Sequence, residues 1–291
     1  MREGAIVLGM RRSGSTLAFN LVRELITKEL ENGILRTTYA DGDAADRFVE
    51  TARLTSSAFV LKTHASGPLV DTLIAAGRVG SIYTWRDPRD AIVSHMNFLK
   101  STFAEAMDMV TTSLFQFEQS WRGYCLEIPY LELYPLTSTL IYNFANYLDI
   151  PCSDELVNRL INQYCLEAMR DFTRRSANFE DEFDFRYMDR KISRTQLWHE
   201  THVQNGGNKL WKQNLTEDQL SILEKSWLIK YFYLLQNITS HSRCRNLAPA
   251  ARDNCEGAED LACADLNFPV HGEWSDFPDD TKSIDLPSLR R

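Results

Sequence analysis

The first candidate site is a short glycine loop, Gly9-Met-Arg-Arg-Ser-Gly-Ser-Thr16, which follows an apolar run and precedes a helical pattern. A loop between a strand and a helix points its backbone N–H groups and the positive end of the helix at one place, which makes an anion site. The spacing imitates the nucleotide-binding pattern G-x4-G-K-[ST], but Ser15 stands where the lysine belongs. Arg11 and Arg12 supply positive charge earlier in the loop. The loop therefore predicts a phosphate site unlike that of a nucleoside triphosphatase.

A second segment, Tyr83-Thr-Trp-Arg-Asp-Pro-Arg-Asp-Ala-Ile-Val-Ser94, combines the end of an apolar run with an arginine and the signals of a helix start. Asp87 is a residue type that caps helices and Pro88 suits the first helical turn, so a helix is expected to begin there. Arg86 then lies at the mouth of the strand, where its guanidinium can bind a phosphate through two parallel hydrogen bonds. We expect Arg89 and Asp90 to be surface and capping residues.

A candidate proton acceptor follows another apolar run. His64 belongs to Lys62-Thr-His64, directly after Ala58 to Leu61. An imidazole with its ordinary pKa of about 6.5 can take a proton from a hydroxyl or an amine near neutral pH. A position at the end of a strand points His64 toward the same crevice as the glycine loop. This placement permits the role of a general base.

These segments together resemble the sulfotransferases that use 3'-phosphoadenosine-5'-phosphosulfate (PAPS). Arg12-Ser-Gly-Ser-Thr16 after an apolar strand is similar to the family's 5'-phosphosulfate loop. The segment with Arg86 and Ser94 is similar to the 3'-phosphate motif, and Lys62-Thr-His64 looks like the segment that carries the catalytic histidine.

A fourth segment, Asn205-Gly-Gly-Asn-Lys-Leu-Trp-Lys212, is more loosely similar to the family's late loop that closes over the 3'-phosphate. Its two glycines allow backbone N–H groups to approach an anion closely. Gln204 or Asn205 replaces the family's basic residue, so Lys209 or Lys212 would have to supply the charge. Trp211 is expected to be a packing anchor.

The resemblance implies a reaction and a set of roles. PAPS would be the donor, adenosine 3',5'-bisphosphate (PAP) the product, and no metal would be needed. His64 would be the catalytic base, while Arg12 and Lys62 would stabilise charge on the leaving phosphate. The cofactor-binding residues would be Arg11, Arg12, Ser13, Gly14, Ser15, Thr16, Arg86, Ser94, Gly207, Asn208 and Lys209.

Several alternatives stay open at this point. Lys62 would otherwise merely cover the edge of the sheet, and a carboxylate of Asp41, Asp43 or Glu50 would replace His64 as the base, as in some branches of the family. A P-loop kinase that uses ATP would place Asp87 on magnesium, against which Ser15 argues. A non-catalytic nucleotide-binding protein would keep the anion site and lack turnover.

The elements that position these residues follow from periodicity. Short apolar runs at Ala5 to Leu8, Ala58 to Leu61, Ser81 to Trp85 and Leu126 to Tyr130 predict buried strands, and helical patterns lie between them. This alternation predicts an α/β fold, a single domain whose central parallel sheet is flanked by helices, and the resemblance specifies the P-loop-like sulfotransferase fold. Thr216 and Gln219 form a capping-box pattern, from which a helix is expected to run to about Gln236.

Composition limits the function. The chain has 291 residues and a net charge of -8, which disfavours nucleic acid, an anionic membrane and a polyanionic acceptor. No apolar run approaches a membrane span, no signal peptide is recognisable, and six scattered cysteines without a CxxC pair fit reduced thiols in the cytoplasm.

The chain is expected to have two parts, a sulfotransferase domain over residues 1–240 and an irregular acidic tail over 241–291. The acceptor pocket would come from stretches without regular pattern, at residues 37–50, 101–120 and 171–202. A small molecule, neutral or cationic, is the expected acceptor, and the oligomeric state is not readable.

Overall fold

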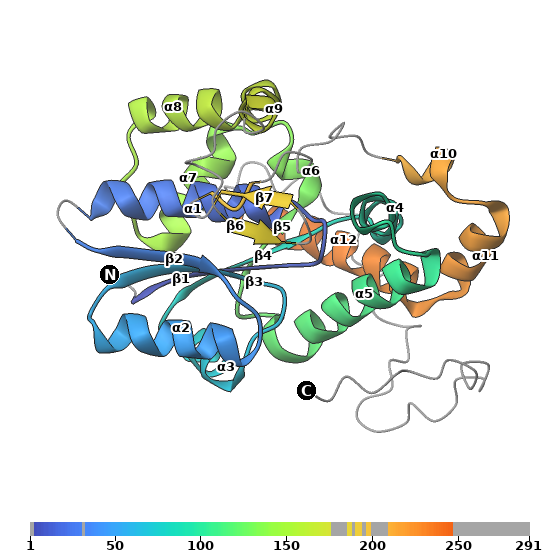
Figure 1. Cartoon of the computed structure of the whole chain (residues 1–291), viewed down its shortest axis with the longest axis horizontal. Coiled ribbons are helices and arrows are strands. Elements are labelled where there is room, and N and C mark those ends of the chain that lie inside the picture. Colours follow the sequence, from blue (N-terminus) through green and yellow to red (C-terminus); the bar gives the residue numbers. More distant parts are fainter. Residues whose placement is uncertain are drawn as a thin grey trace. The chain divides into compact units, whose positions relative to one another are not determined.

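The computed structural model describes residues 3–30, 33–175, 185–187, 190–193, 196–198 and 209–246. Its centre is a parallel five-stranded sheet with the strand order β2-β3-β1-β4-β5 (Figure 1). The strands are β1 (Gly4–Gly9), β2 (Leu35–Tyr39), β3 (Ala58–Thr63), β4 (Gly80–Trp85) and β5 (Leu126–Pro129). The predicted α/β fold is confirmed, and each of the four apolar runs forms a strand where it was expected.

The side chains of the central strands alternate between two cores because successive residues of a strand point to opposite faces. In β1, Ile6 and Leu8 belong to one core, while Ala5 and Val7 belong to the other. Both faces of the sheet are therefore covered, which explains why these strands read as continuous apolar runs.

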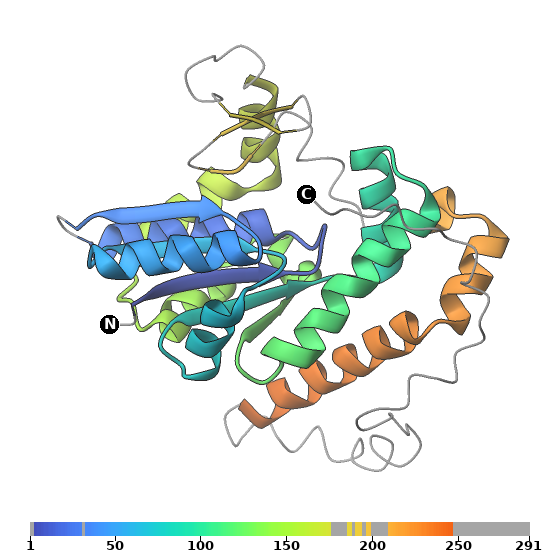
Figure 2. The same cartoon turned by 60° about the horizontal axis from the view of Figure 1, so that its bottom comes forward.

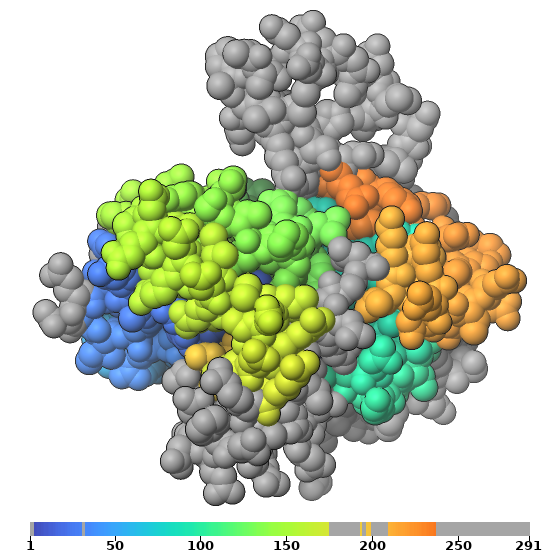
Figure 3. All heavy atoms as spheres, turned by 90° about the horizontal axis from the view of Figure 1, so that it is seen from above, coloured from blue at the N-terminus to red at the C-terminus, as the bar shows by residue number. Residues whose placement is uncertain are grey.

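One face of the sheet is covered by helices from the first and the middle parts of the chain. Figure 3 shows the later ones, in green to yellow-green, spread over the blue amino-terminal segments. These helices are α1 (Ser15–Glu29), α6 (Tyr130–Leu133), α7 (Ser138–Leu148), α8 (Asp154–Tyr164) and α9 (Leu166–Arg175). The predicted apolar stripe of the first helix, which includes Leu17, Leu21 and Leu25, is buried in this core.

The other face is covered by helices that the chain adds after β2, β3 and β4. Figure 2 shows α4 and α5 as neighbouring helices beside the sheet. The elements of this layer are α2 (Asp43–Leu54), α3 (Pro68–Ala75), α4 (Pro88–Leu99), α5 (Phe103–Gln116) and the π-helical turn η1 (Phe117–Trp121), and buried residues of the later helices, between 223 and 235, join the same core. The stretches at 37–50 and 101–120, expected to lack regular structure, therefore contain β2, α2 and α5.

The last part of the described chain differs from the single helix expected up to Gln236. The structure has α10 (Trp211–Asn214), α11 (Glu217–Lys225) and α12 (Trp227–Asn246), and the capping box of Thr216 and Gln219 is confirmed at the start of α11. Ser226 ends α11 because its ψ of 150° is extended and its hydroxyl donates to the Leu223 carbonyl at 2.6 Å. Residues 241–246 are helical, so the prediction of an irregular tail from 241 is wrong for them.

A compact unit spans Met1–Leu235, and residues 247–291 lie outside the described residues. A small antiparallel pair, β6 (Phe185–Tyr187) and β7 (Arg190–Ile192), follows α9. None of the helices described here is both long and apolar enough to cross a membrane.

The order of the strands determines where a ligand site belongs. From β1 the chain first builds β2 and β3 on one side and then β4 and β5 on the other. A crevice forms at such a switch point, outside the carboxyl ends of the strands. The glycine loop follows β1 and Arg86 follows β4, so both predicted anion sites lie at this switch point, at the carboxyl ends of two neighbouring strands.

Candidate functional site

The glycine loop is held open by bonds to the neighbouring strand. Met10 N donates to the Thr84 carbonyl at 2.9 Å, and the Ser13 hydroxyl lies 2.6 Å from both the Met10 carbonyl oxygen and the Thr84 hydroxyl. Gly9 has no room for a side chain, since an added Cβ would lie 2.6 Å from the Thr84 hydroxyl. The hydroxyl of Ser13 therefore fixes the conformation of the loop by bonding both the loop itself and β4.

Helix α1 begins at this loop without a side-chain cap. The first N–H groups of a helix have no partner within the helix, so those of Ser15 and Thr16 face the mouth of the loop with the positive end of the helix dipole. Gly14 precedes them at φ 89°, a left-handed conformation that favours glycine. The geometry is that of an anion site.

His64 lies beside this loop with a defined tautomer. Its Nδ1 is 2.7 Å from the carbonyl oxygen of Gly9, which can only accept a hydrogen bond, so the proton is on Nδ1. The other ring nitrogen, Nε2, then carries a lone pair and lies 3.3 Å from the ammonium of Lys62. Burial, with the charges of Lys62 and Arg11, lowers the pKa of His64 well below its ordinary value. The neutral imidazole is thus the ground state near neutral pH.

Lys62 is itself a perturbed group. The residue is buried, and its ammonium lies 4.7 Å from the centre of the Tyr39 ring. Burial lowers the pKa of Lys62 to about 7; the charge of Asp41 opposes this shift, and those of Arg11 and Arg12 add to it. An anion bound at the glycine loop would favour the charged form of this lysine.

Asp41, weighed as a rival base, is occupied in holding His64. Its Oδ1 accepts bonds from His64 N at 2.7 Å, the Thr63 hydroxyl at 2.9 Å and Ala65 N at 3.2 Å. Its Oδ2 accepts from the Tyr39 hydroxyl at 2.6 Å. Burial raises the pKa of Asp41, but these bonds and the nearby His64 outweigh it and lower the pKa below the ordinary value. A carboxylate with a lowered pKa is a poor base, and the hydrogen bonds of Asp41 instead hold the main chain of His64 in place.

The two arginines of the glycine loop point in different directions. The Arg12 Nε donates to the Ser94 hydroxyl at 3.1 Å, and its guanidinium lies over the Phe98 ring. The guanidinium of Arg11 is partly exposed and lies 3.8 Å from the carboxylate of Asp41. Arg12 therefore connects the glycine loop to α4, and Arg11 connects it to the segment that holds His64.

Arg86 is buried at the end of β4, with its guanidinium 4.1 Å from the centre of the Tyr130 ring. Asp87 caps α4 as predicted, accepting from Arg89 N at 3.0 Å, and its carboxylate also binds the Arg89 side chain. The expectation of a surface position is wrong for Asp90, which is buried and accepts from the backbone of Lys209 and Trp211. Local spacing favours a cap there because it does not reveal a partner more than a hundred residues away.

The structure thus brings most predicted site residues to one edge of the sheet. The exceptions are Gly207 and Asn208, which lie outside the described residues. Trp211 is confirmed as a packing residue, with the Arg89 guanidinium 4.2 Å from its ring centre. Tyr39 and Asp90 were missed as contributors to the site, and no local sequence signal identifies them.

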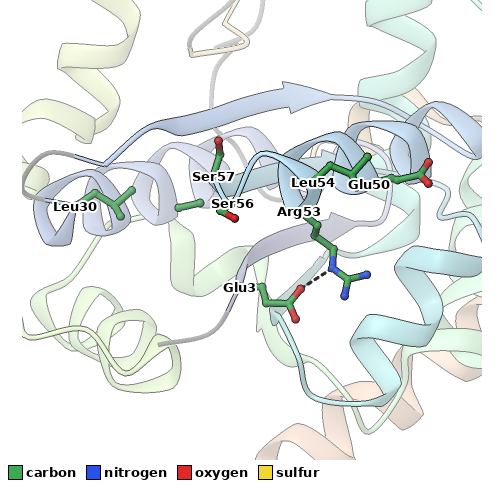
Figure 4. A pocket seen from close by; sticks show the side chains of 8 residues that line it. Glu3, Leu30, Glu50, Arg53, Leu54, Ser56 and Ser57 are labelled. Atoms are coloured by element: carbon green, nitrogen blue, oxygen red, sulfur yellow. Dashed lines mark ion pairs between the residues drawn. The ribbon is translucent and has the colours of Figure 1, made fainter.

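A hollow occurs at the opposite edge of the sheet (Figure 4). Its walls come from the segment before β1, the ends of α1 and α2 and the start of β3, and an ion pair of 2.8 Å joins Glu3 to Arg53 across it. The hollow therefore lies at the amino ends of the strands, away from His64 and the glycine loop. It is lined by Glu3, Leu30, Glu50, Arg53, Leu54, Ser56, Ser57 and Ala58.

Comparison with known proteins gives one family. The sulfotransferase domain matches residues 2–228. Mouse sulfotransferase SULT7A1 complexed with PAP has a similar structure, with 13% identity, a TM-score of 0.53 and coverage of 77% of this chain and 83% of that one.

Retinol dehydratase is similar in two structures, each 17% identical to this chain. For its complex with retinol and PAP the TM-score is 0.52, and the match covers 79% of this chain and 81% of that one. For its complex with androsterone and inactive cofactor PAP the TM-score is 0.51, and the match covers 79% of this chain and 80% of that one. At such identities the likeness concerns the fold. No curated protein matches the chain significantly in sequence.

Proposed function

Because the chain belongs to the sulfotransferase domain family, we propose that it transfers the sulfuryl group of PAPS to a hydroxyl or an amine of a small-molecule acceptor. One observation carries the proposal: the carbonyl of Gly9, in the anion loop itself, binds Nδ1 of His64 and leaves Nε2 as an acceptor. A single residue of the loop thus links the donor site to the base.

The phosphosulfate would bind the N–H groups of the glycine loop together with Arg11 and Arg12, and the 3'-phosphate would bind Arg86 and Ser94. The Arg12–Ser94 hydrogen bond supports this division, since it joins the two anion sites. Lys209 would add charge from the late segment, with Gly207 and Asn208 as further proposed contacts. Ser13 would act through its hydroxyl, which shapes the loop.

The transfer step would proceed in line at sulfur. The acceptor oxygen or nitrogen forms a bond to sulfur, while the bond between sulfur and the 5'-phosphate oxygen breaks. His64 Nε2 takes the acceptor proton, and charged Lys62 and Arg12 stabilise the negative charge that develops on the leaving phosphate. The products are the sulfated acceptor and PAP.

The acceptor would be neutral or cationic. Retinol dehydratase, with a similar fold, has been solved with the small molecules retinol and androsterone. The net charge of -8 disfavours a polyanion, and the anionic donor would use the local positive charge of the site. A cytoplasmic location is proposed as well, which the free thiols of Cys125, Cys152 and Cys165 support.

Sulfuryl transfer from labelled PAPS to a panel of hydroxyl and amine acceptors tests the proposal. We expect His64→Ala to lower the rate by about 10²–10⁴-fold, the usual contribution of a general base, while PAP still binds. Equal rates in the two proteins would exclude His64 as the base.

Calorimetry with PAP and with magnesium ATP separates the proposed enzyme from a kinase. The contacts of Asp87 argue against the kinase, since both carboxylate oxygens bind Arg89 rather than face a metal site. Tight binding of ATP without binding of PAP would reject the sulfotransferase proposal. PAP binding without transfer to any acceptor would favour a non-catalytic nucleotide-binding protein.

A further inference from the structure

Asp90 is a buried carboxylate for which the proposed reaction has no direct use. It lies in the first turn of α4, and only 2% of its surface is exposed. A carboxylate in such a place must be compensated by hydrogen bonds or by a cation, because burial removes its hydration. The identity of its partners therefore indicates what it holds.

The partners of Asp90 come from the late segment of the chain. Oδ2 accepts from the backbone N–H of Lys209 at 2.8 Å, and Oδ1 accepts from that of Trp211 at 3.3 Å. Both oxygens are used, one for each N–H group. The start of α4 thus holds the late segment by its main chain, whatever side chains that segment carries.

Lys209 needs such support. Its φ of 62° is left-handed, a conformation that is unfavourable for a residue with a side chain. Strained backbone of this kind persists where its surroundings determine it, and the bond to Asp90 is one such determinant. The stacking of Arg89 on the Trp211 ring gives the same segment a second attachment to the same helical turn.

Asp90 also lies beside the proposed 3'-phosphate site. The Arg86 guanidinium is 3.8 Å from Asp90 Oδ2, the oxygen that binds Lys209 N. A fixed negative charge next to a phosphate site opposes phosphate binding by simple repulsion. Its presence is understandable if the carboxylate contributes more by positioning than it costs by repulsion.

We propose that Asp90 is a positioning residue for the 3'-phosphate, which holds Lys209 and Trp211 against the end of β4 so that Lys209 and Arg86 bind the phosphate together. The inference rests on the proposed function, because it assumes that Arg86 binds the 3'-phosphate. It assigns 3'-phosphate selectivity to a residue that does not touch the nucleotide.

The test compares PAP with adenosine 5'-phosphate, which lacks the 3'-phosphate, in calorimetric titrations of the full chain. In Asp90→Asn one oxygen becomes an amide nitrogen, which cannot accept from the backbone. We expect the ratio of the two affinities to fall at least about 10-fold, the typical effect of losing a charged hydrogen bond. Asp46→Asn is the matched control, because its two carboxylate oxygens also accept from backbone N–H groups, those of Leu69 and Val70, on the other side of β1, so the ratio should not change.

Two results for Asp90→Asn would overturn the inference. An equal loss of affinity for both nucleotides would make Asp90 a general structural residue, and a raised ratio would mean that its charge only repels the phosphate. A wild-type protein that does not prefer PAP would instead reject the proposed function, so the two failures are distinguishable.

Amide hydrogen exchange of the wild-type chain gives a second test if Asp90→Asn does not fold. We expect PAP to slow exchange in the peptide that contains Lys209 and Trp211, and adenosine 5'-phosphate to leave it unchanged. Equal effects of the two nucleotides on this peptide would overturn the inference.

Discussion

Asp41 and His64 form a unit in which the carboxylate supports the base without touching its ring. Asp41→Asn keeps an amide oxygen that can accept from His64 N, but it removes a charge that raises the pKa of His64. We therefore expect a loss of transfer rate of about 10-fold or less, well below the loss in His64→Ala. The acid limb of the pH–rate profile, which the lowered pKa of His64 already places well below pH 6.5, should move further to lower pH, because the imidazole then stays neutral further into acid.

The same assay identifies the base among the rivals. Asp43→Asn is the control, because Asp43 lies two residues on, in the first turn of α2, with an exposed side chain. A loss in Asp41→Asn as large as in His64→Ala would make Asp41 the base and contradict the assignment.

The lowered pKa of Lys62 predicts that the protein uses PAPS less efficiently at alkaline pH. The proposed role needs the charged ammonium, and burial lowers the pKa of Lys62 to about 7 in the free protein. Since kcat/KM reports ionisations of the free enzyme, kcat/KM for PAPS should fall as the pH rises through about 7. No acid limb is expected down to pH values well below 6.5, because the lowered pKa of His64 keeps its imidazole neutral there.

Lys62→Arg provides the control for that limb, since a guanidinium stays charged throughout the range. In this variant the fall in kcat/KM near pH 7 should disappear, even if the absolute rate is lower. A limb that persists unchanged in Lys62→Arg would belong to another group.

At the scale of elements, Gly14 couples the glycine loop to α6. A Cβ at this position would lie 2.8 Å from Leu133 Cδ1 and 3.2 Å from Tyr130 Cδ2, in addition to the strain of φ 89°. We expect Gly14→Ala to destabilise the fold by about 2–3 kcal/mol, from backbone strain plus overpacking. It should also weaken PAP binding, because the start of α1 must shift. Denaturant unfolding and calorimetry measure the two effects.

Gly123→Ala is a matched control for the backbone term. Gly123 has a similar φ of 82°, but nothing lies within 4 Å of its added Cβ. This variant should lose only the strain of about 1–2 kcal/mol and keep its affinity for PAP. If both variants lose equal stability and neither loses affinity, the contact with α6 is irrelevant to the site.

The accuracy of sequence-based prediction differed between elements for physical reasons. The four buried strands were predicted because two covered faces require continuous apolar runs, as in Ala5 to Leu8. Strand β2, Leu-Arg-Thr-Thr-Tyr, was missed because it is an edge strand that is only partly buried and carries polar side chains. Helix α5 was missed although Thr102 and Glu105 form a capping box that marks its start.

The same distinction applies to the site. The glycine loop and the Asp87 cap are local patterns that the sequence displays, and the structure contains both. The carboxylate of Asp41, after β2, accepts from His64, after the neighbouring strand β3, and that of Asp90 accepts from Lys209, which lies 119 residues later in the chain. Such contacts depend on strand order, which local spacing does not encode.

At the scale of the whole molecule, the proposed donor would bridge loops on both sides of the switch point between β1 and β4. A ligand that binds only the folded state raises the free energy of unfolding by about 2.7 kcal/mol at 100 times its dissociation constant. For a unit of this size such a gain raises the melting temperature by roughly 5–10 °C. We therefore expect PAP to raise the melting temperature by that amount, and adenosine 5'-phosphate at the same concentration to raise it much less.

The difference between the two nucleotides should depend on the residue that follows β4. In Arg86→Ala the 3'-phosphate loses its proposed guanidinium and keeps only Ser94 and Lys209, so the difference in stabilisation between PAP and adenosine 5'-phosphate should become much smaller. Arg78→Ala controls for the loss of an arginine, since Arg78 pairs with Glu3 at the amino edge of the sheet. A PAP-specific shift that is undiminished in Arg86→Ala would contradict the binding of the 3'-phosphate by Arg86 at the end of β4. Because the melting of the whole unit is measured, this experiment tests whether one ligand links both halves of the sheet.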